Sequence, residues 1–203
     1  QGTTLILDLP PNRVFEDLHP RLIDLDGDGH DEIIVVESDK GLGASLAVYG
    51  IVDGHLAKRS ATPFLGKSNR WLNPLGAGDF NGDGKLDIAL VATPHIGGIL
   101  RLYHFTEPKL SKFAEYRGVS THSLGNTELG LGRVVKNVPR DQLLLPDQSR
   151  RRLLLLEWTP KGWLDHDQID LPGDIRSSLI SSGMNRWRFL LGNDIYYEIR
   201  IDP

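Results

Sequence analysis

Two short acidic segments of the sequence carry oxygen-bearing side chains at the same spacing. The first loop runs from Asp24 to Glu32 and reads DLDGDGHDE, and the second loop runs from Asp79 to Asp87 and reads DFNGDGKLD. Each places a carboxylate or amide oxygen at positions 1, 3, 5 and 9 and leaves position 7 to offer a backbone carbonyl. A hard cation such as Ca²⁺ takes six to eight oxygens at about 2.3–2.6 Å. The spacing therefore predicts one structural calcium site in each loop.

The predicted ligands include two residues, His30 and Lys85, that act through their backbone carbonyls. The first site is formed by Asp24, Asp26, Asp28, His30 and Glu32, and the second by Asp79, Asn81, Asp83, Lys85 and Asp87. Crowded carboxylates repel one another unless a cation neutralises them or some are protonated. Turns rich in Asp and Gly also form without a metal, but the recurrence of the whole pattern favours the metal. The imidazole of His30 is expected to point outward.

An EF-hand is the nearest alternative for such loops, and it needs a bidentate Glu at position 12 and flanking helices. Position 12 is Val35 in the first loop and Leu90 in the second. Apolar residues, many of them β-branched, follow each loop at 33–36 and 88–91, which favours a buried strand over a helix. Each loop is therefore expected to lead directly into a strand.

The combination of this loop with a following strand resembles the FG-GAP, or VCBS, repeat. That family forms β-propeller blades with the loop DxDGDGxxD/E between the first two strands of a blade, as in integrin α-subunits. The lead-in Gly76–Phe80 also resembles the family, and the resemblance covers about 22–52 and 72–105. Four further segments are similar to small bacterial VCBS-repeat proteins of undefined role: Arg13–Leu18, Leu46–Gly50, Thr62–Phe64 and Arg70–Leu72. The resemblance implies an all-β propeller stabilised by calcium.

Segments that read as strands recur with a period of about 50 residues, which is typical of propellers. The expected strands are Arg21–Leu25, Glu32–Glu37, Ser45–Tyr49, Leu56–Ser60, Leu75–Phe80, Asp87–Ala92, Ile99–Phe105, Lys112–Tyr116, Leu129–Val135, Asp141–Leu145, Arg152–Trp158, Gly162–Leu171, Ile175–Ser181, Arg186–Leu191 and Asp194–Ile201. The third unit has no carboxylate at the ligand positions, which are Val134, Lys136, Val138 and Gln142. No ion is expected there, and Arg13–Leu18 is expected to form at most a helical turn.

These segments predict one β-propeller domain over 1–203, with four blades of four-stranded antiparallel sheet. The approximate blades are 19–66, 70–118, 122–172, and 173–203 completed by 3–9. The strand Thr3–Leu9 is expected to close the ring, because closure removes exposed sheet edges. A fragment of a larger propeller is the alternative. A ring of four blades should leave only a narrow central channel.

Composition excludes several other classes of protein. The chain of 203 residues has no cysteine and a net charge of −4, so it contains neither disulfides nor thiolate–metal sites. No apolar run is long enough to span a membrane, and no basic stripe suggests nucleic acid. Arg150–Arg152 is expected to form a solvated hairpin turn. Calcium sites fill where free calcium is high, which predicts an extracytoplasmic protein, periplasmic or secreted; a first residue of Gln1 fits a cleaved signal peptide or a trimmed chain.

No sequence motif indicates catalysis. The seven histidines show no zinc-binding spacing, although His95, His104 and His122 could approach one another on one face; scattered surface side chains are the alternative. No serine or cysteine nucleophile motif occurs. Paired glycosidase-like carboxylates stay an alternative, because any two acids can meet across blades.

Aromatic side chains could form a platform for sugars or could pack between blades. The candidates are Trp71, Trp158, Trp163, Trp187, Tyr196 and Tyr197. Trp71 and Trp187 lie near expected strand ends and are the two expected to be exposed. The sequence as a whole predicts a non-catalytic, calcium-stabilised module that binds a protein or a glycan. The alternatives are an accessory subunit of a larger cell-envelope complex and a polysaccharide hydrolase or lyase.

Overall fold

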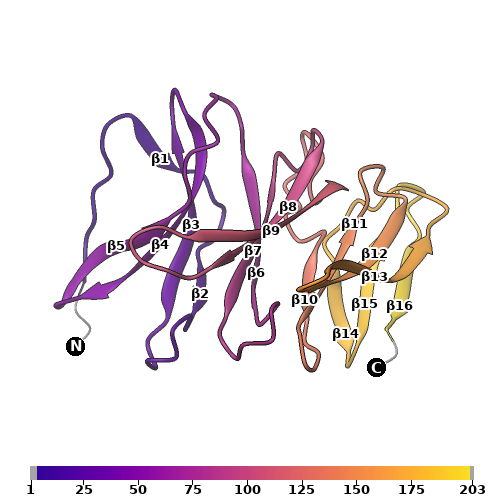
Figure 1. Cartoon of the computed structure of the whole chain (residues 1–203). Helices are drawn as coiled ribbons and strands as arrows, with labels where there is room; N and C mark the ends of the chain where they lie inside the picture. The colour runs from indigo at the N-terminus through magenta and orange to yellow at the C-terminus, as the bar shows by residue number, and fades with distance from the viewer. Residues whose placement is uncertain (1–3, 202–203) are drawn as a thin grey trace.

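The computed structural model describes residues 4–201, which form four antiparallel sheets and contain no helix (Figure 1). The first sheet contains β1 (Arg13–Phe15), β2 (Arg21–Ile23), β3 (Glu32–Asp39), β4 (Gly43–Val52) and β5 (His55–Ala61). The second contains β6 (Leu72–Gly78), β7 (Asp87–Ala92), β8 (Gly98–His104) and β9 (Ser111–Val119). The third contains β10 (Arg133–Val135), β11 (Gln142–Pro146), β12 (Arg152–Thr159) and β13 (Gly162–Asp170). The fourth contains β14 (Ile180–Gly183), β15 (Arg186–Leu190) and β16 (Tyr196–Arg200).

The sheets follow one another as the blades of a propeller, so the predicted all-β fold is confirmed. In the second, third and fourth sheets the strands pair in chain order, whereas in the first sheet β1 and β2 both pair with β3. Every expected strand from Arg21–Leu25 onward has a counterpart, with ends shifted by up to five residues. Arg150 and Arg151 lie in the turn between β11 and β12, as expected. Over residues 4–201 there is no helix long and apolar enough to cross a membrane.

The second strand paired in each of the first three sheets, β3, β7 or β11, is buried on both faces, and this joins neighbouring sheets. On β7, Ile88 and Leu90 pack against the first sheet, whereas Ala89 and Val91 pack against the third. The same division occurs on β11, where Leu143 faces the second sheet and Leu144 faces the fourth. Successive side chains of a strand point to opposite faces, so a continuous apolar run is the pattern that such sandwiched strands require.

The segment expected to be a helical turn is instead the strand β1. Its residues pair with the C-terminal half of β3, with Arg13 opposite Asp39, while β2 pairs with the N-terminal half. Residues 16–20 connect the two short strands and belong to neither, so the inner strand of the first sheet is interrupted. The expectation for Arg13–Leu18 was wrong because pairing with β3 is a non-local contact that local propensity does not report.

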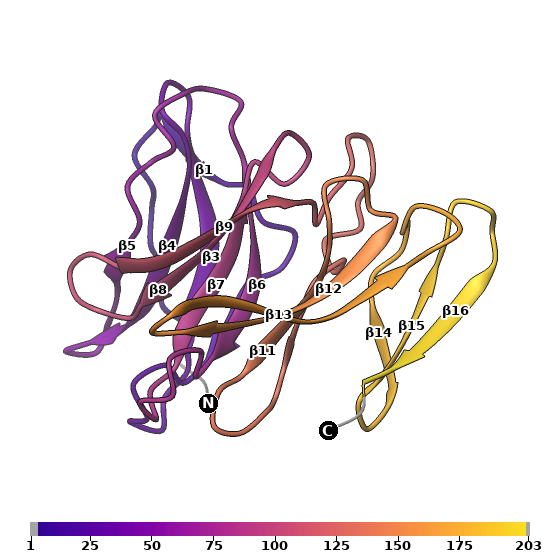
Figure 2. The same cartoon turned by 45° about the vertical axis from the view of Figure 1, so that its right-hand side comes forward.

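The expected closing strand is not found in the described residues. Thr3 lies outside them, and residues 4–9 form no strand; Leu7 instead packs on Val35, Ala47 and Tyr49 of the first sheet. The fourth sheet keeps three strands. The first and fourth sheets lie at opposite ends of the arc in both views (Figures 1 and 2).

Charged side chains lie on one face of the fourth sheet. Arg186 and Arg188 share one face of β15, and both reach Glu198 of β16, with the Arg188 Nε to Glu198 Oε2 distance at 2.8 Å. Burying such a charged face against another sheet would be costly. The corresponding outer face of the first sheet is covered in part by the N-terminal segment. The closing role assigned to Thr3–Leu9 is therefore corrected.

The inner edges of the sheets gather around a central pocket of about 320 Å³. Its lining includes Asp17 and Arg21 from the first sheet, Leu75 from the second, Arg133 from the third and Ser178 from the segment before β14. Arg21 donates to Asp17 over 2.7 Å, and Arg133 donates to the Leu179 carbonyl over 2.8 Å. This narrow, polar space lies where a propeller has its axis.

Candidate metal centre

The first loop is organised by the carboxylate of Asp24, its first residue. Oδ1 of Asp24 accepts the backbone N–H of Gly27 at 2.8 Å and of Asp28 at 3.1 Å, and Oδ2 accepts that of Gly29 at 3.0 Å. Gly27 and Gly29 have φ values of 77° and 87°, which residues with a Cβ atom rarely adopt. Asp28 in turn accepts the N–H of His30 at 2.8 Å. The loop therefore curls around its own acidic side chains.

The second loop repeats this hydrogen-bond pattern residue for residue. Oδ1 of Asp79 accepts the N–H of Gly82 at 2.7 Å and of Asp83 at 3.1 Å, and Oδ2 accepts that of Gly84 at 2.9 Å. Asp83 accepts the N–H of Lys85 at 2.9 Å. Hydrogen bonds from Asn81 and then from the Lys85 backbone lower the pKa of Asp83. Two segments that are 55 positions apart thus adopt one local structure.

Each loop has a feature that suits a bound cation, a carboxylate cluster in the first and a buried carboxylate oxygen in the second. One oxygen each from Asp24, Asp26 and Asp28 lie within 4.8 Å of one another. In the second loop, Asp87 is 2% exposed, and its Oδ2 atom is buried without a hydrogen-bond partner among the described residues. Burial raises the pKa of Asp87 to about 6. A buried carboxylate oxygen without a partner is costly, and a cation at the loop would relieve that cost, so the residues present fit a hard divalent ion.

The ninth position of each loop is the first residue of the next strand, and its neighbour on the adjacent strand differs from sheet to sheet. Asp87 lies opposite His104 on β8, and the two are joined by a 2.8 Å hydrogen bond to Oδ1 of Asp87. The equivalent neighbour of Glu32 is Gly50, which has no side chain. In the third sheet Gln142 is at the ninth position and Glu157 is its neighbour, and Gln142 donates a hydrogen bond to Glu157 at 3.3 Å. The base of the loop is thus built differently in each blade.

A β-bulge in the last strand pair of these three sheets supplies a further side chain. The unpaired residues are Arg59, Phe113 and His166. Arg59 fills the space left by Gly50 and donates to Glu32 at 2.7 Å and to Asp26 at 2.8 Å. Phe113 stacks on His104 with ring centroids 4.1 Å apart, and His166 bonds Glu157 at 2.7 Å. Arg59 could not be identified from the sequence, because the bulge that directs it at the first loop depends on strand register.

The turn between β10 and β11 shows an internal ion pair. Lys136, at one of the positions equivalent to a ligand, donates to Oδ2 of Asp141 at 2.7 Å. The same carboxylate accepts the N–H of Asp79 at 2.8 Å, while the Asp141 N–H donates to the Asp79 carbonyl, also at 2.8 Å. Arg140 donates to the carbonyl of Asn81 at 3.1 Å. The third sheet therefore clamps the second loop from outside.

The structure brings together two of the three histidines proposed as a cluster. His95 and His122 have ring centroids 6.0 Å apart, and Trp71 lies 5.1 Å from His122. His104, at the end of β8, bonds Asp87 of the second loop instead. Burial, followed by the charges of His122 and Arg70, lowers the pKa of His95. His30 is exposed, as expected for a residue that would contribute only its carbonyl.

The aromatic candidates mostly serve packing. Trp158 and Trp163 pack between the second and third sheets, and Trp163 donates to the Glu115 carbonyl at 2.9 Å. Trp187 is 8% exposed within the core between the third and fourth sheets, so its expected exposure was wrong. Tyr197 packs on the same core. Trp71 is half-buried, and Tyr196 is exposed. These side chains form no common platform.

Comparison with protein families connects both loops to one repeat type. Residues 24–90 match the family model described as FG-GAP-like repeat. The match covers about a third of the chain; it begins at the first ligand position of the first loop, includes the whole second loop and ends within β7. None of the curated proteins matches the chain. The chain therefore carries FG-GAP-like repeat sequence over residues 24–90, set in a β-propeller fold.

Proposed function

We propose that the protein is a non-catalytic interaction module whose first two blades are stabilised by calcium. The observation that carries the proposal is the pair of loops with matching hydrogen bonds, together with the convergence of Asp24, Asp26 and Asp28 in the first loop and the buried, unpartnered Asp87 oxygen in the second. The ions would be held by Asp24, Asp26, Asp28 and Glu32 in the first loop and by Asp79, Asn81, Asp83 and Asp87 in the second, with the carbonyls of His30 and Lys85. A bound ion would neutralise the crowded carboxylates and tie the end of one strand to the start of the next.

A structural role for the ions follows from where the loops lie. Each loop joins the inner strand of a blade to the strand that is buried on both faces, so its order affects the core directly. Asp24, Asp26, Asp83 and Asp87 also line one pocket of about 640 Å³ between the loops. A protein whose blades are fixed in this way presents rigid turns for binding. We place this role outside the cytosol, where calcium sites of moderate affinity are filled.

Thermal unfolding with and without calcium tests the proposal. At a free calcium concentration of 100 times Kd, each site adds about 2.7 kcal/mol to the free energy of unfolding. For a protein of this size that corresponds to a rise in Tm of roughly 5–10 °C per site. Isothermal titration should give two calcium ions per chain, falling to one in Asp24→Asn and in Asp79→Asn.

Asp53→Asn is the matched control, because Asp53 is an exposed acid in the turn between β4 and β5. It should keep both sites and the full rise in Tm. If EDTA leaves the Tm of the native chain unchanged, calcium has no structural role and the proposal fails.

A further inference from the structure

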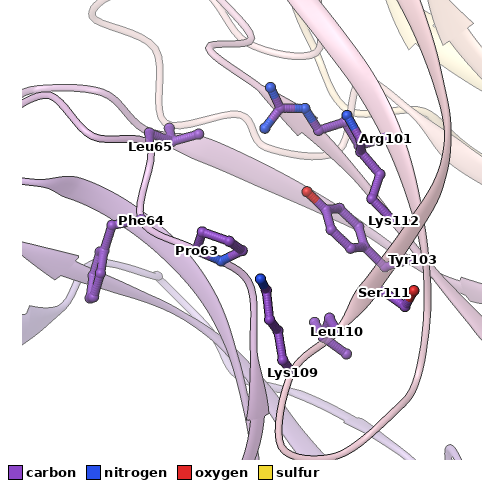
Figure 3. Close-up of a pocket in the computed structure, with 9 residues that line it drawn as sticks. All are labelled: Pro63, Phe64, Leu65, Arg101, Tyr103, Lys109, Leu110, Ser111 and Lys112. Atoms are coloured by element: carbon purple, nitrogen blue, oxygen red, sulfur yellow. The ribbon is translucent and has the colours of Figure 1, made fainter.

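A basic pocket lies between the first and second sheets, apart from the acidic loops. It has a volume of about 580 Å³ and is bordered by the segment after β5 and by β8 and β9. Pro63, Leu65 and Leu110 form its apolar wall, and Arg101, Tyr103, Lys109 and Lys112 supply its polar groups. In Figure 3 the Tyr103 hydroxyl, the Lys109 ammonium and the Arg101 guanidinium extend into the same space.

Strand geometry explains why these side chains share one side of the sheet. Arg101 and Tyr103 are two residues apart on β8, so they project from the same face, which is the face toward the first sheet. Tyr103 pairs with Lys112 on β9, directly after the bulge at Phe113. Leu110 donates its backbone N–H to the Ala61 carbonyl at 3.1 Å, and this contact fixes the loop that carries Lys109.

Positive charge exceeds negative charge in this pocket. Glu115 is the acid beside it, and its carboxylate is shared by Lys112 at 2.9 Å, Arg117 at 2.9 Å and Arg101 at 3.9 Å. The Lys109 side chain has no ion-pair partner within residues 4–201. Nε of Arg101 is buried without a hydrogen-bond acceptor in the same range. The chain as a whole carries a net charge of −4, so this local excess of cations differs in sign from the rest of the molecule.

We propose that this pocket binds an acidic sugar, with the acid group held between Lys109, Arg101 and the Tyr103 hydroxyl. The inference deepens the proposed interaction role and rests on it. A carboxylate or sulfate would accept charge-assisted hydrogen bonds from the Lys109 ammonium and the Arg101 guanidinium and a further one from the Tyr103 hydroxyl. The apolar wall of Pro63, Leu65 and Leu110 suits the C–H face of a pyranose ring, and the volume suits one or two sugar units.

Two other classes of anionic ligand fit the pocket less well. A free phosphate would pair with the Arg and Lys side chains as a carboxylate does, but it would leave the apolar wall of Pro63, Leu65 and Leu110 uncovered. The C-terminal carboxylate of a peptide is captured by backbone nests, and the pocket's donors are side chains on strands and a loop. Long side-chain donors beside an apolar wall favour an acid group that is attached to a bulky ring.

Titration with defined oligosaccharides tests the inference. Trigalacturonate and a sulfated chondroitin disaccharide are the acidic probes, maltotriose is the neutral probe and hexaglutamate is the peptide probe. We expect one of the acidic sugars to bind, and raising NaCl from 50 to 500 mM to weaken that binding, because salt screens exposed charges. Binding of maltotriose with equal affinity, or of hexaglutamate with equal or higher affinity, would overturn the assignment.

Substitutions separate the pocket from general surface charge. Lys109→Gln and Tyr103→Phe should each weaken binding of the acidic sugar by about fivefold or more, because each removes one donor to the acid group. Lys161→Gln, which removes an exposed lysine in the turn between β12 and β13, should leave the affinity unchanged. Equal affinities for Lys109→Gln and Lys161→Gln would exclude this pocket as the binding site.

The calcium dependence of Tm is measured on the same samples. If calcium raises Tm and no acidic sugar binds, the sugar site is wrong and the proposed calcium-stabilised module stands. If an acidic sugar binds and calcium leaves Tm unchanged, the site stands and the structural role of calcium fails.

Discussion

Arg59 donates from Nη1 to Oε1 of Glu32 over 2.7 Å, which places a fixed cation at the last ligand position of the first loop. The second loop has no arginine at the equivalent place, since its last ligand, Asp87, is bonded instead by His104. Gly50 makes the difference possible: a Cβ at this position would lie 2.6 Å from Cδ of Arg59. The two predicted calcium sites are therefore unequal, although their ligand patterns read alike.

The first prediction concerns Arg59→Gln. Without calcium the substitution leaves Glu32, which is 2% exposed, lacking its charged partner. We expect the free energy of unfolding to fall by about 1–3 kcal/mol. With saturating calcium the loss should shrink, because the ion neutralises the same carboxylate. Urea unfolding in EDTA and in calcium measures both values.

Arg152→Gln is the control for Arg59→Gln, because Arg152 forms an exposed pair with Asp170 and such pairs contribute little. Its effect should be small in both conditions. A loss for Arg59→Gln that is the same with and without calcium would show that Arg59 does not share its site with the ion.

The second prediction concerns Asp141→Ala. Asp141 accepts hydrogen bonds from the backbone of Asp79 and from Lys136, so its removal leaves the Asp79 N–H without an acceptor. We expect a loss of about 2–3 kcal/mol in unfolding free energy and weaker calcium binding at the second loop only. Calorimetry should then resolve one unchanged and one weakened site. Asp167→Ala, at an exposed position on β13, should change neither, and equal weakening of both sites would contradict the clamp.

Local patterns were enough to predict the acidic loops and nearly every strand. The curl of the loop at Asp79–Asp87 is local, because the hydrogen bonds that the Asp79 carboxylate accepts join residues no more than five positions apart. The apolar run Ile88–Ala92 is likewise a direct consequence of burial on both faces. Such features depend on neighbours in the chain, and a single sequence contains them in full.

Features that depend on strand register or on distant segments were missed. The bulge that aims Arg59 at Glu32 requires the pairing of β4 with β5. Burial of Trp187 depends on how the fourth sheet packs against the third. The closing role given to Thr3–Leu9 followed from counting strands, whereas Leu7 packs on the first sheet. Each error has the same origin, namely a tertiary contact between segments far apart in the chain.

The third prediction concerns Gly98, the first residue of β8. A Cβ at Gly98 would lie 2.0 Å from the backbone oxygen of Val119, and a backbone atom in a strand cannot move aside at little cost. We expect Gly98→Ala to lower the free energy of unfolding by about 1–3 kcal/mol or more. At Gly41 the nearest atom would be 3.6 Å away, so Gly41→Ala should have an effect near zero. Similar urea midpoints for the two variants would contradict the close approach.

The last prediction concerns the acid stability that Glu37 provides. Its fully buried carboxylate accepts hydrogen bonds from Arg13 at 2.9 Å, from Tyr49 at 2.8 Å and from Lys58. Burial alone would raise the pKa of Glu37, but these hydrogen bonds outweigh it and hold the pKa below its ordinary value of 4.5. At a pH between the lowered pKa of Glu37 in the folded chain and its ordinary pKa of 4.5 in the unfolded chain, the unfolded chain binds more protons than the folded one. Stability from Glu37 is therefore complete above about pH 4.5 and is lost as the pH falls through the lowered pKa.

Glu37→Gln should remove this contribution and flatten the acid limb of the stability curve. At pH 7 the variant should be less stable by about 1–3 kcal/mol, and the gap to the native chain should close as the pH is lowered to 3. Urea unfolding in EDTA at several pH values measures the gap. Asp8→Asn, at an exposed position, should follow the native curve. A gap that stays constant from pH 7 to pH 3 would mean that the Glu37 carboxylate does not titrate as these contacts require.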